Sequence, residues 1–278
     1  MSADTRTFFI VSSGRSGTAM LHKALSAAGD IEMHHEYMVH IIQPLAVRRY
    51  MGLVDGADAR AILASTHAAA ARYSEAAHWG DSSNKLSWLI PELAELMPQA
   101  RFVHLVRDGR KVASSYFHKL GAECYDDRST SVLQAHFDDP VARPAPPPEK
   151  KYWWPLPRRN DPRAPEFRRY DQFARIAWHW AEINATILNS LQALPANRQF
   201  FVRLEDLVAS PRLVRALFEF LDRPYRDDDF RIFARPHNVN RPEDRPLNDR
   251  QREAFAAIAS PMMDRLGYAE RDEYVVNY

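Results

Sequence analysis

The chain has 278 residues, long enough to bury a substantial core, and its 46% hydrophobic and 26% charged residues are typical of a globular protein. Its 37 Lys and Arg residues balance 36 Asp and Glu residues, and a net charge of +1 argues against a domain that coats nucleic acid. The one cysteine, Cys124, excludes an internal disulfide and a zinc site built from several cysteines.

The N-terminal segment runs directly into an apolar stretch, without the apolar core and small-residue cleavage site of a secretory signal. No run approaches the roughly 18 apolar residues that a spanning helix needs. A lone cysteine also fits a reducing compartment. We therefore expect a cytoplasmic protein with no membrane span.

Three short apolar runs rich in β-forming residues are each followed by a helical pattern. The runs are 7–12, 101–106 and 199–203, and the helices after them are expected at 18–28, 112–120 and 212–221. Further helices are expected at 43–50, 57–77, 86–97, 170–194 and 249–266. Strands that alternate with helices favour an α/β fold, with a parallel central sheet flanked by helices.

One segment, 140–165, departs from this pattern. It holds nine of the nineteen prolines, the pair Trp153 and Trp154, and several arginines and lysines, so regular structure is not expected there. We interpret it as part of an insertion at about 123–168 in one domain that spans 1–278. Two roles stay open: a lid that recognises a sugar or an acidic acceptor through indole faces and guanidinium groups, or a solvated loop or oligomer contact.

The first chemical motif, SSGRSGT at 12–18, lies between an expected strand and an expected helix. Glycines permit a tight turn and let backbone N–H groups approach an anion, and the helix N-terminus adds its positive dipole. The motif therefore predicts a phosphate-binding loop. Gly14 and Gly17 are three residues apart and no Lys-Ser or Lys-Thr pair follows, so the loop does not fit the Walker pattern of nucleoside-triphosphate kinases.

The second motif, VRDGRKVASSY at 106–116, is another strand-to-helix junction. Arg107 stands at the strand end and Ser115 lies on the following helix, where a hydroxyl and a guanidinium can share one oxyanion. Two anion sites at neighbouring strand ends suit a ligand that carries phosphate groups at two places.

These two stretches, SSGRSGTAML and RFVHLVRDGRKVASSY, resemble the sulfotransferases that use 3'-phosphoadenosine 5'-phosphosulfate (PAPS). VRLEDL at 202–207, followed by Pro211, and the pair Gly267-Tyr268 resemble later parts of the same family. The resemblance spans about 8–268 and implies the P-loop-like sulfotransferase fold. It also implies PAPS as co-substrate, an acceptor hydroxyl and no metal.

The resemblance assigns roles to individual residues. It implies that the 5'-phosphosulfate is held by Gly14, Arg15, Ser16, Gly17, Thr18 and Ala19, with Arg15 on the transferring sulfuryl group. It implies that Arg107 and Ser115 hold the 3'-phosphate and that Arg241, in a late loop, adds to them. Lys85, in an Asn-Lys pair, would stabilise the leaving oxygen, although a solvated lysine near a helix start is an equal alternative. Leu204 replaces a tyrosine that the family often places near the adenine.

The general base is expected at Glu36, which falls twenty-one residues after Arg15. The family members that sulfate protein tyrosine use a glutamate base at this same distance from the loop arginine. His35 is the main rival and His34 the second, because histidine titrates near neutral pH. The histidine pair lacks the i, i+4 spacing of a zinc-binding helix, so a metal site is not expected.

We therefore expect a sulfotransferase that acts by in-line displacement on a small-molecule or glycan acceptor, with lipid and tyrosine hydroxyls also open and no nucleic-acid partner. One alternative is a P-loop kinase that uses ATP. The other is a non-catalytic nucleotide-binding protein of the same fold.

Overall fold

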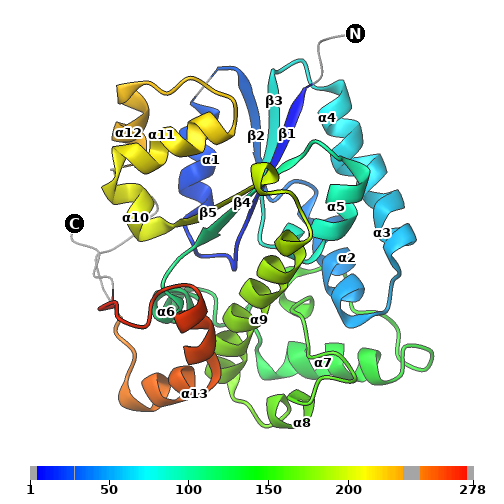
Figure 1. The fold of residues 1–278 in the computed structure, drawn as a ribbon. Helices are drawn as coiled ribbons and strands as arrows, with labels where there is room; N and C mark the ends of the chain where they lie inside the picture. Colours follow the sequence, from blue (N-terminus) through cyan, green and yellow to red (C-terminus); the bar gives the residue numbers. More distant parts are fainter. Residues whose placement is uncertain (1–4, 28, 234–244, 274–278) are drawn as a thin grey trace.

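The computed structural model describes residues 5–27, 29–233 and 245–273 and is built on a sheet of five parallel strands (Figure 1). The strands are β1 (Arg6–Val11), β2 (Ile31–His35), β3 (His78–Ser82), β4 (Arg101–Val106) and β5 (Gln199–Arg203), and their order in the sheet is β2-β3-β1-β4-β5. Helices cover the sheet on both sides. This α/β architecture confirms the fold class expected from the sequence.

Strands β1, β4 and β5 lie where the apolar runs predicted them, but β2 and β3 were missed. Their sequences, IEMHH and HWGDS, are short and polar, so no hydrophobic run marks them. All five residues of β3 are nevertheless buried, because the strand pairs with β1 on one side and β2 on the other. Asp81 and Ser82 of this strand form hydrogen bonds with residues of the neighbouring elements, which satisfies their polar side chains inside the protein.

The helices form one layer on each side of the sheet, as Figure 1 shows. One side carries α1 (Thr18–Ser26), α10 (Leu204–Ala209), α11 (Pro211–Phe220) and α12 (Asp227–Phe233). The other side carries α2 (Val39–Met51), α3 (Gly56–Leu63), α4 (Ala69–Tyr73), α5 (Ile90–Leu96), α6 (Gly109–Lys119), α9 (Gln172–Gln192) and α13 (Asp249–Arg265). Strand β1 serves both layers: Phe8 and Ile10 pack into the first, and Phe9 and Val11 into the second.

Two predicted helices are interrupted in the structure. The stretch 57–77 becomes α3, a π-helical segment η1 (Ala64–Ala68) and α4, and the stretch 86–97 becomes a 3-10 turn η2 (Leu86–Trp88) and α5. Helix α6 begins three residues earlier than expected, because the Asp108 carboxylate accepts a hydrogen bond from the Arg110 N–H and caps the helix.

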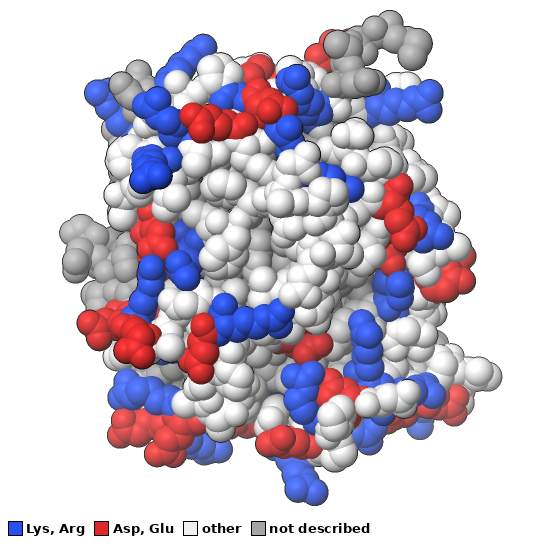
Figure 2. All heavy atoms as spheres, in the orientation of Figure 1, with Lys and Arg blue, Asp and Glu red and all other residues white. Residues whose placement is uncertain are grey.

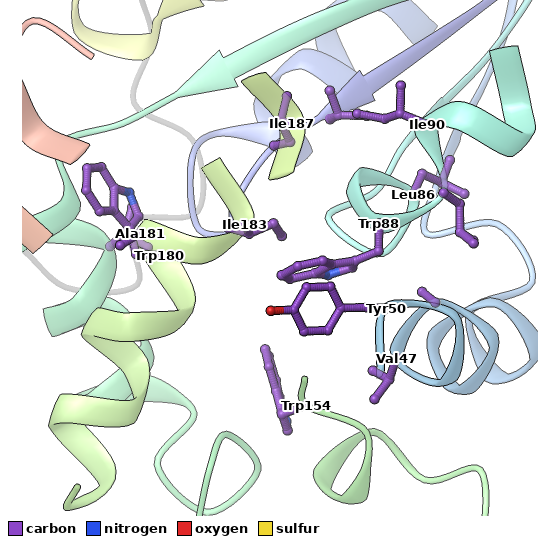
Figure 3. Close-up of a cluster of buried hydrophobic side chains, with 14 of the residues drawn as sticks. Val47, Tyr50, Leu86, Trp88, Ile90, Trp154, Trp180, Ala181, Ile183 and Ile187 are labelled. Atoms are coloured by element: carbon purple, nitrogen blue, oxygen red, sulfur yellow. The ribbon is translucent and has the colours of Figure 1, made fainter. Parts of the chain in front are cut away.

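The insertion is packed into the protein and not solvated at its tryptophans. It contains α7 (Asp127–Asp138), the 3-10 turn η3 (Lys150–Tyr152) and α8 (Ala164–Phe167). Trp153 and Trp154 are only 3% and 4% exposed and belong to the same core cluster as Tyr50 and Trp88, whose ring centroids are 4.5 Å apart (Figure 3). Gln43 of α2 donates a 2.8 Å hydrogen bond to the Trp153 carbonyl. The alternative of a solvated loop is therefore wrong for Trp153 and Trp154, whose indoles fill core volume, and the role of a lid stays a prediction.

Charged side chains of both signs are interspersed along the margins of the face in Figure 2, and uncharged side chains cover its middle. This face gives no large area of one sign, in keeping with the net charge of +1. Within the part of the chain that the structure describes, no helix is both long and apolar enough to cross a membrane.

Candidate active site

The loop 12–17 connects β1 to α1 and is held in one conformation by its own side chains. The Gly14 N–H donates to the Ser12 Oγ at 3.0 Å, and the Ser16 Oγ donates to the Gly14 carbonyl at 3.0 Å. Gly14 (φ 77°) and Gly17 (φ 93°) have left-handed backbones. These contacts fix the turn before any ligand arrives.

Space as well as conformation requires glycine in this loop. A Cβ on Gly14 would lie 2.0 Å from the Tyr116 Oη, and a Cβ on Gly17 would lie 2.7 Å from Leu204 Cδ1. Helix α1 starts at Thr18. Because Gly17 has no side chain to cap the helix, no capping side chain occupies the N–H groups of the first turn. The sequence-predicted residues from Gly14 to Ala19 thus form a tight strand-to-helix turn of the kind that binds anions.

Three predicted anion-binding residues meet on one side of this loop. The Arg15 Nε donates to the Ser115 Oγ at 3.0 Å, and the Arg107 Nη1 donates to the Arg15 carbonyl at 3.1 Å. The two motifs, nearly a hundred residues apart in the chain, therefore form one cationic cluster. In this arrangement the Arg15 guanidinium points to the second motif and not to Glu36.

The later motif residues hold this cluster in place. Glu205 accepts the Asp108 N–H at 2.9 Å through one carboxylate oxygen and the Tyr268 hydroxyl at 2.8 Å through the other. Asp108 immediately follows Arg107 and caps α6, so Glu205 fixes the strand end that presents Arg107. Glu205 of the EDL motif and Tyr268 of the GY motif thus hold the second motif, which is predicted to bind an anion, in place.

Glu36 and Lys85 meet on the other side of the loop. The Lys85 Nζ donates to the Glu36 Oε1, and the side chains are 5% and 28% exposed, respectively. Burial pushes the pKa of Glu36 upward, but the adjacent Lys85 ammonium outweighs burial and holds that pKa below its ordinary value. Burial also lowers the pKa of Lys85, against the pull of the carboxylate. Glu36 is therefore ionised at neutral pH, and the lowered pKa makes it a weaker base than a glutamate whose pKa burial raises.

The rival histidines have other hydrogen-bond partners. The His35 Nδ1 lies 2.9 Å from the Ser82 carbonyl and 2.8 Å from the Ser82 Oγ, and its ring approaches His22 of α1. The His34 Nε2 lies 2.9 Å from the Glu32 Oε1. Neither ring has a hydrogen bond to Lys85 among the contacts of the described residues, and Glu36 does.

One residue of the site, Tyr116, was not singled out in the sequence, although it ends the second motif. Tyr116 is buried between the two sides: its hydroxyl donates to the Ser13 carbonyl at 2.9 Å and accepts from the Asn84 Nδ2 at 3.4 Å. Burial raises the pKa of Tyr116 well above its ordinary value, so the hydroxyl stays protonated. The position of this residue within the second motif was the only hint.

A small cavity lies next to Lys85. Asn84 and Lys85 line it from the loop after β3, and the indoles of Trp88, Trp153 and Trp154 form much of its wall. About 10 Å³ of the cavity is open to the centre of a water molecule, which is room for roughly one water. The insertion thus contributes a wall close to the Glu36–Lys85 pair.

Two further expectations concern residues around the site. Arg241 lies outside the described residues, so its predicted role on the 3'-phosphate stays a prediction. Among the residues that the structure describes, no three His, Cys, Asp or Glu side chains are grouped closely enough to hold a metal ion.

Comparison with known proteins gives the family. The model of the sulfotransferase family matches residues 7–145, half of the chain. None of the curated proteins compared with the chain matches it. A sulfotransferase from Alicyclobacillus acidocaldarius is 15% identical, with a TM-score of 0.55 over 98% of this chain and 98% of that chain. The sulfotransferase domain from the Synechococcus PCC 7002 olefin synthase is 16% identical, with a TM-score of 0.50 over 99% of this chain and 98% of that chain. These structures share the fold, and the family match shows that the chain belongs to the sulfotransferase family.

Proposed function

We propose that this protein transfers the sulfuryl group of PAPS to an acceptor hydroxyl by in-line displacement. The observation that carries the proposal is the arrangement around the loop 12–17, with Arg15, Arg107 and Ser115 on one side and Glu36 with Lys85 on the other. A nucleotide with anionic groups at two positions can bind with one group at the loop and the other at Arg107 and Ser115. An acceptor hydroxyl can donate its proton to Glu36 of the Glu36–Lys85 pair.

The residues present fit such a donor. The left-handed glycines let the chain turn tightly from β1 into α1, so that backbone N–H groups at the start of α1 can face a phosphosulfate. Arg107 and Ser115 supply a fixed positive charge and a hydroxyl for the 3'-phosphate. Since Arg15 already contacts Ser115, it would bind the same donor from the loop side, and contact with the sulfuryl group would require its guanidinium to turn.

Glu36 is proposed as the base. Its carboxylate takes the proton of the acceptor hydroxyl as that oxygen forms a bond to sulfur, while the bond from sulfur to the bridging oxygen of the phosphosulfate breaks. Lys85 has three N–H donors, so it can keep its hydrogen bond to Glu36 and also donate to the bridging oxygen, where negative charge collects. Adenosine 3',5'-bisphosphate leaves, and Glu36 later gives its proton to water.

The acceptor is proposed to be the hydroxyl of a small molecule or a glycan. The cavity beside Lys85 has room for roughly one water between the indole walls, so in its present shape it holds neither a small molecule nor a glycan. A bulky group next to the hydroxyl would require the Trp153–Trp154 segment to move.

Thermal-shift titration tests the donor. Adenosine 3',5'-bisphosphate is expected to raise Tm in a saturable way, and ATP with magnesium is expected to raise it far less, because stabilisation follows the affinity for the folded state. Transfer of labelled sulfate from PAPS to a panel of alcohols, phenols and sugars then tests the reaction. Equal shifts for the two nucleotides would contradict the donor assignment, and binding without any transfer would favour a non-catalytic nucleotide-binding protein.

A further inference from the structure

Glu36 stands in a turn that its own sequence does not favour. The turn joins β2 to α2, and both Glu36 (φ 58°) and Met38 (φ 53°) have left-handed backbones. Side chains other than glycine rarely adopt this conformation, so contacts from elsewhere must hold the turn. Strained backbone of this kind is often found at functional sites.

Two consecutive residues of β3 provide those contacts. The Glu36 N–H donates to the Ser82 carbonyl at 3.1 Å, and the Tyr37 N–H donates to the Asp81 Oδ1 at 3.3 Å. The peptide group on each side of Glu36 is therefore tied to the neighbouring strand. Asp81 is fully buried, so its carboxylate is not available to water.

His67 contacts both Asp81 and Tyr37 and so also supports the turn. Its Nε2 lies 3.3 Å from the Asp81 Oδ2, and His67 is also fully buried. The Tyr37 ring stands edge-on to the His67 ring, with centroids 5.4 Å apart. His67 belongs to the π-helical segment η1, and such segments occur frequently at functional sites. The interruption of the long helix thus coincides with the residue that contacts Asp81.

We propose that the His67–Asp81 pair is a positioning device for the base: it holds the Glu36 turn so that the carboxylate meets Lys85. Asp81 and His67 touch neither the loop 12–17 nor the Arg15 cluster among the contacts of the described residues. Their loss should therefore reduce turnover and leave donor binding intact. This inference rests on the proposed function, because it assigns Glu36 the role of base.

The test compares Asp81→Ala and His67→Phe with the conservative Asp81→Asn. Asp81→Ala removes the acceptor for Tyr37, and His67→Phe keeps a ring against Tyr37 but removes the hydrogen bond to Asp81. Asp81→Asn keeps an oxygen for the Tyr37 N–H. Glu92→Ala is the matched control, because Glu92 is also a buried carboxylate (3% exposed), and its partner Arg49 lies near the opposite end of α2 from Glu36.

Two readouts separate positioning from general loss of stability. Hydrogen–deuterium exchange of a peptide that covers the Glu36 turn should be faster in Asp81→Ala and His67→Phe than in wild type and Glu92→Ala, with a loop 12–17 peptide unchanged. With the best acceptor of the panel, kcat of Asp81→Ala should fall about 10- to 100-fold, since misplacement of about 1 Å can cost that much. Asp81→Asn should recover most of this loss, and the Kd for adenosine 3',5'-bisphosphate should change less than about threefold, because the donor side is untouched.

Three outcomes would overturn the inference. The first is unchanged exchange at the Glu36 turn, the second is a loosened turn with unchanged kcat, and the third is a loss of donor affinity as large as the loss of kcat. The exchange measurement needs no acceptor. If wild-type protein transfers no sulfate, the proposed function fails, and the exchange data still decide whether the pair holds the turn.

Discussion

The two sides of the loop 12–17 are built in different ways. On the donor side, Arg15, Arg107 and Ser115 come from recognisable motifs and contact one another directly. On the acceptor side, Glu36 and Lys85 follow strands β2 and β3, and their geometry depends on residues beneath them. If the proposed roles hold, the difference teaches that anion binding depends on the motif residues themselves, whereas placement of the base depends on the packing around a strained turn. Donor affinity and turnover should therefore be separable by substitution.

After Glu36 itself, the largest separation is expected for Lys85→Met on the acceptor side. The substitution keeps an unbranched side chain but removes the ammonium beside Glu36, so charge on the leaving oxygen is no longer neutralised. We expect kcat to fall by about 10²- to 10³-fold, with a much smaller change in the Kd for adenosine 3',5'-bisphosphate. Labelled sulfate transfer and calorimetry measure the two quantities. Lys23→Met, at an exposed position of α1, is the control, and a Lys85→Met enzyme with near wild-type kcat would remove Lys85 from the mechanism.

The converse result is expected for Arg107→Ala on the donor side. Loss of a charged hydrogen-bond donor to a phosphate costs about 1.5–3 kcal/mol, which corresponds to a Kd for adenosine 3',5'-bisphosphate raised roughly 10- to 100-fold. At saturating PAPS, kcat should change little. Arg110→Ala is a matched control in the same turn, since Arg110 pairs with Asp108. Equal losses for the two variants would mean that Arg107 only stabilises the turn.

A smaller and shared effect is expected for Tyr116→Phe, because this residue lies between the two sides. The substitution removes the hydrogen bond to the Ser13 carbonyl and leaves the Asn84 amide without its contact to the hydroxyl. Stability should fall by about 1 kcal/mol, and both kcat and donor affinity should fall by less than about tenfold. Denaturant unfolding and the two assays above test this. A loss confined to one side would show that Tyr116 does not connect them.

The smallest effect on donor affinity is expected from acid titration of two buried histidines, His104 and His179. Burial lowers the pKa of His104 to about 4 and that of His179 to about 3. In the unfolded chain histidines titrate at about 6.5, so below that pH the unfolded state binds protons that the folded state does not. Stability should therefore decrease as pH falls from about 6.5 toward 4, while donor affinity changes little.

Thermal unfolding between pH 7 and pH 5 measures this dependence. The loss of Tm over that range should be smaller in His104→Gln than in wild type, because one of the two groups is gone. An unchanged pH dependence would mean that His104 is not held neutral by burial.

Much of the fold was readable from the sequence because its signals are local. The apolar strands β1, β4 and β5 and the glycine turn after β1 follow from patterns of a few residues. The short polar strands β2 and β3 were not readable, since their burial depends on neighbours in the sheet. The π-helical break that contains His67 was missed for the same reason: it forms where that ring meets Asp81, a contact across the fold.

In the candidate site, too, local motifs could be predicted and packing between distant segments could not. Arg15, Arg107 and Ser115 were expected from their motifs, and Glu36 and Lys85 from the family resemblance, and the structure brings each group together. The burial of Trp154 and its place beside the Lys85 cavity could not be predicted, because a proline-rich segment has no periodic pattern.

The central claim is that Glu36, and not His35, accepts the acceptor proton. The most direct measurement is kcat for labelled sulfate transfer at saturating PAPS with Glu36→Gln and His35→Ala side by side. Glu36→Gln should lose about 10²- to 10⁴-fold in kcat, the usual contribution of a general base, and should bind adenosine 3',5'-bisphosphate like wild type, while His35→Ala keeps most of its activity. Near-full activity in Glu36→Gln together with loss of activity in His35→Ala would contradict the claim.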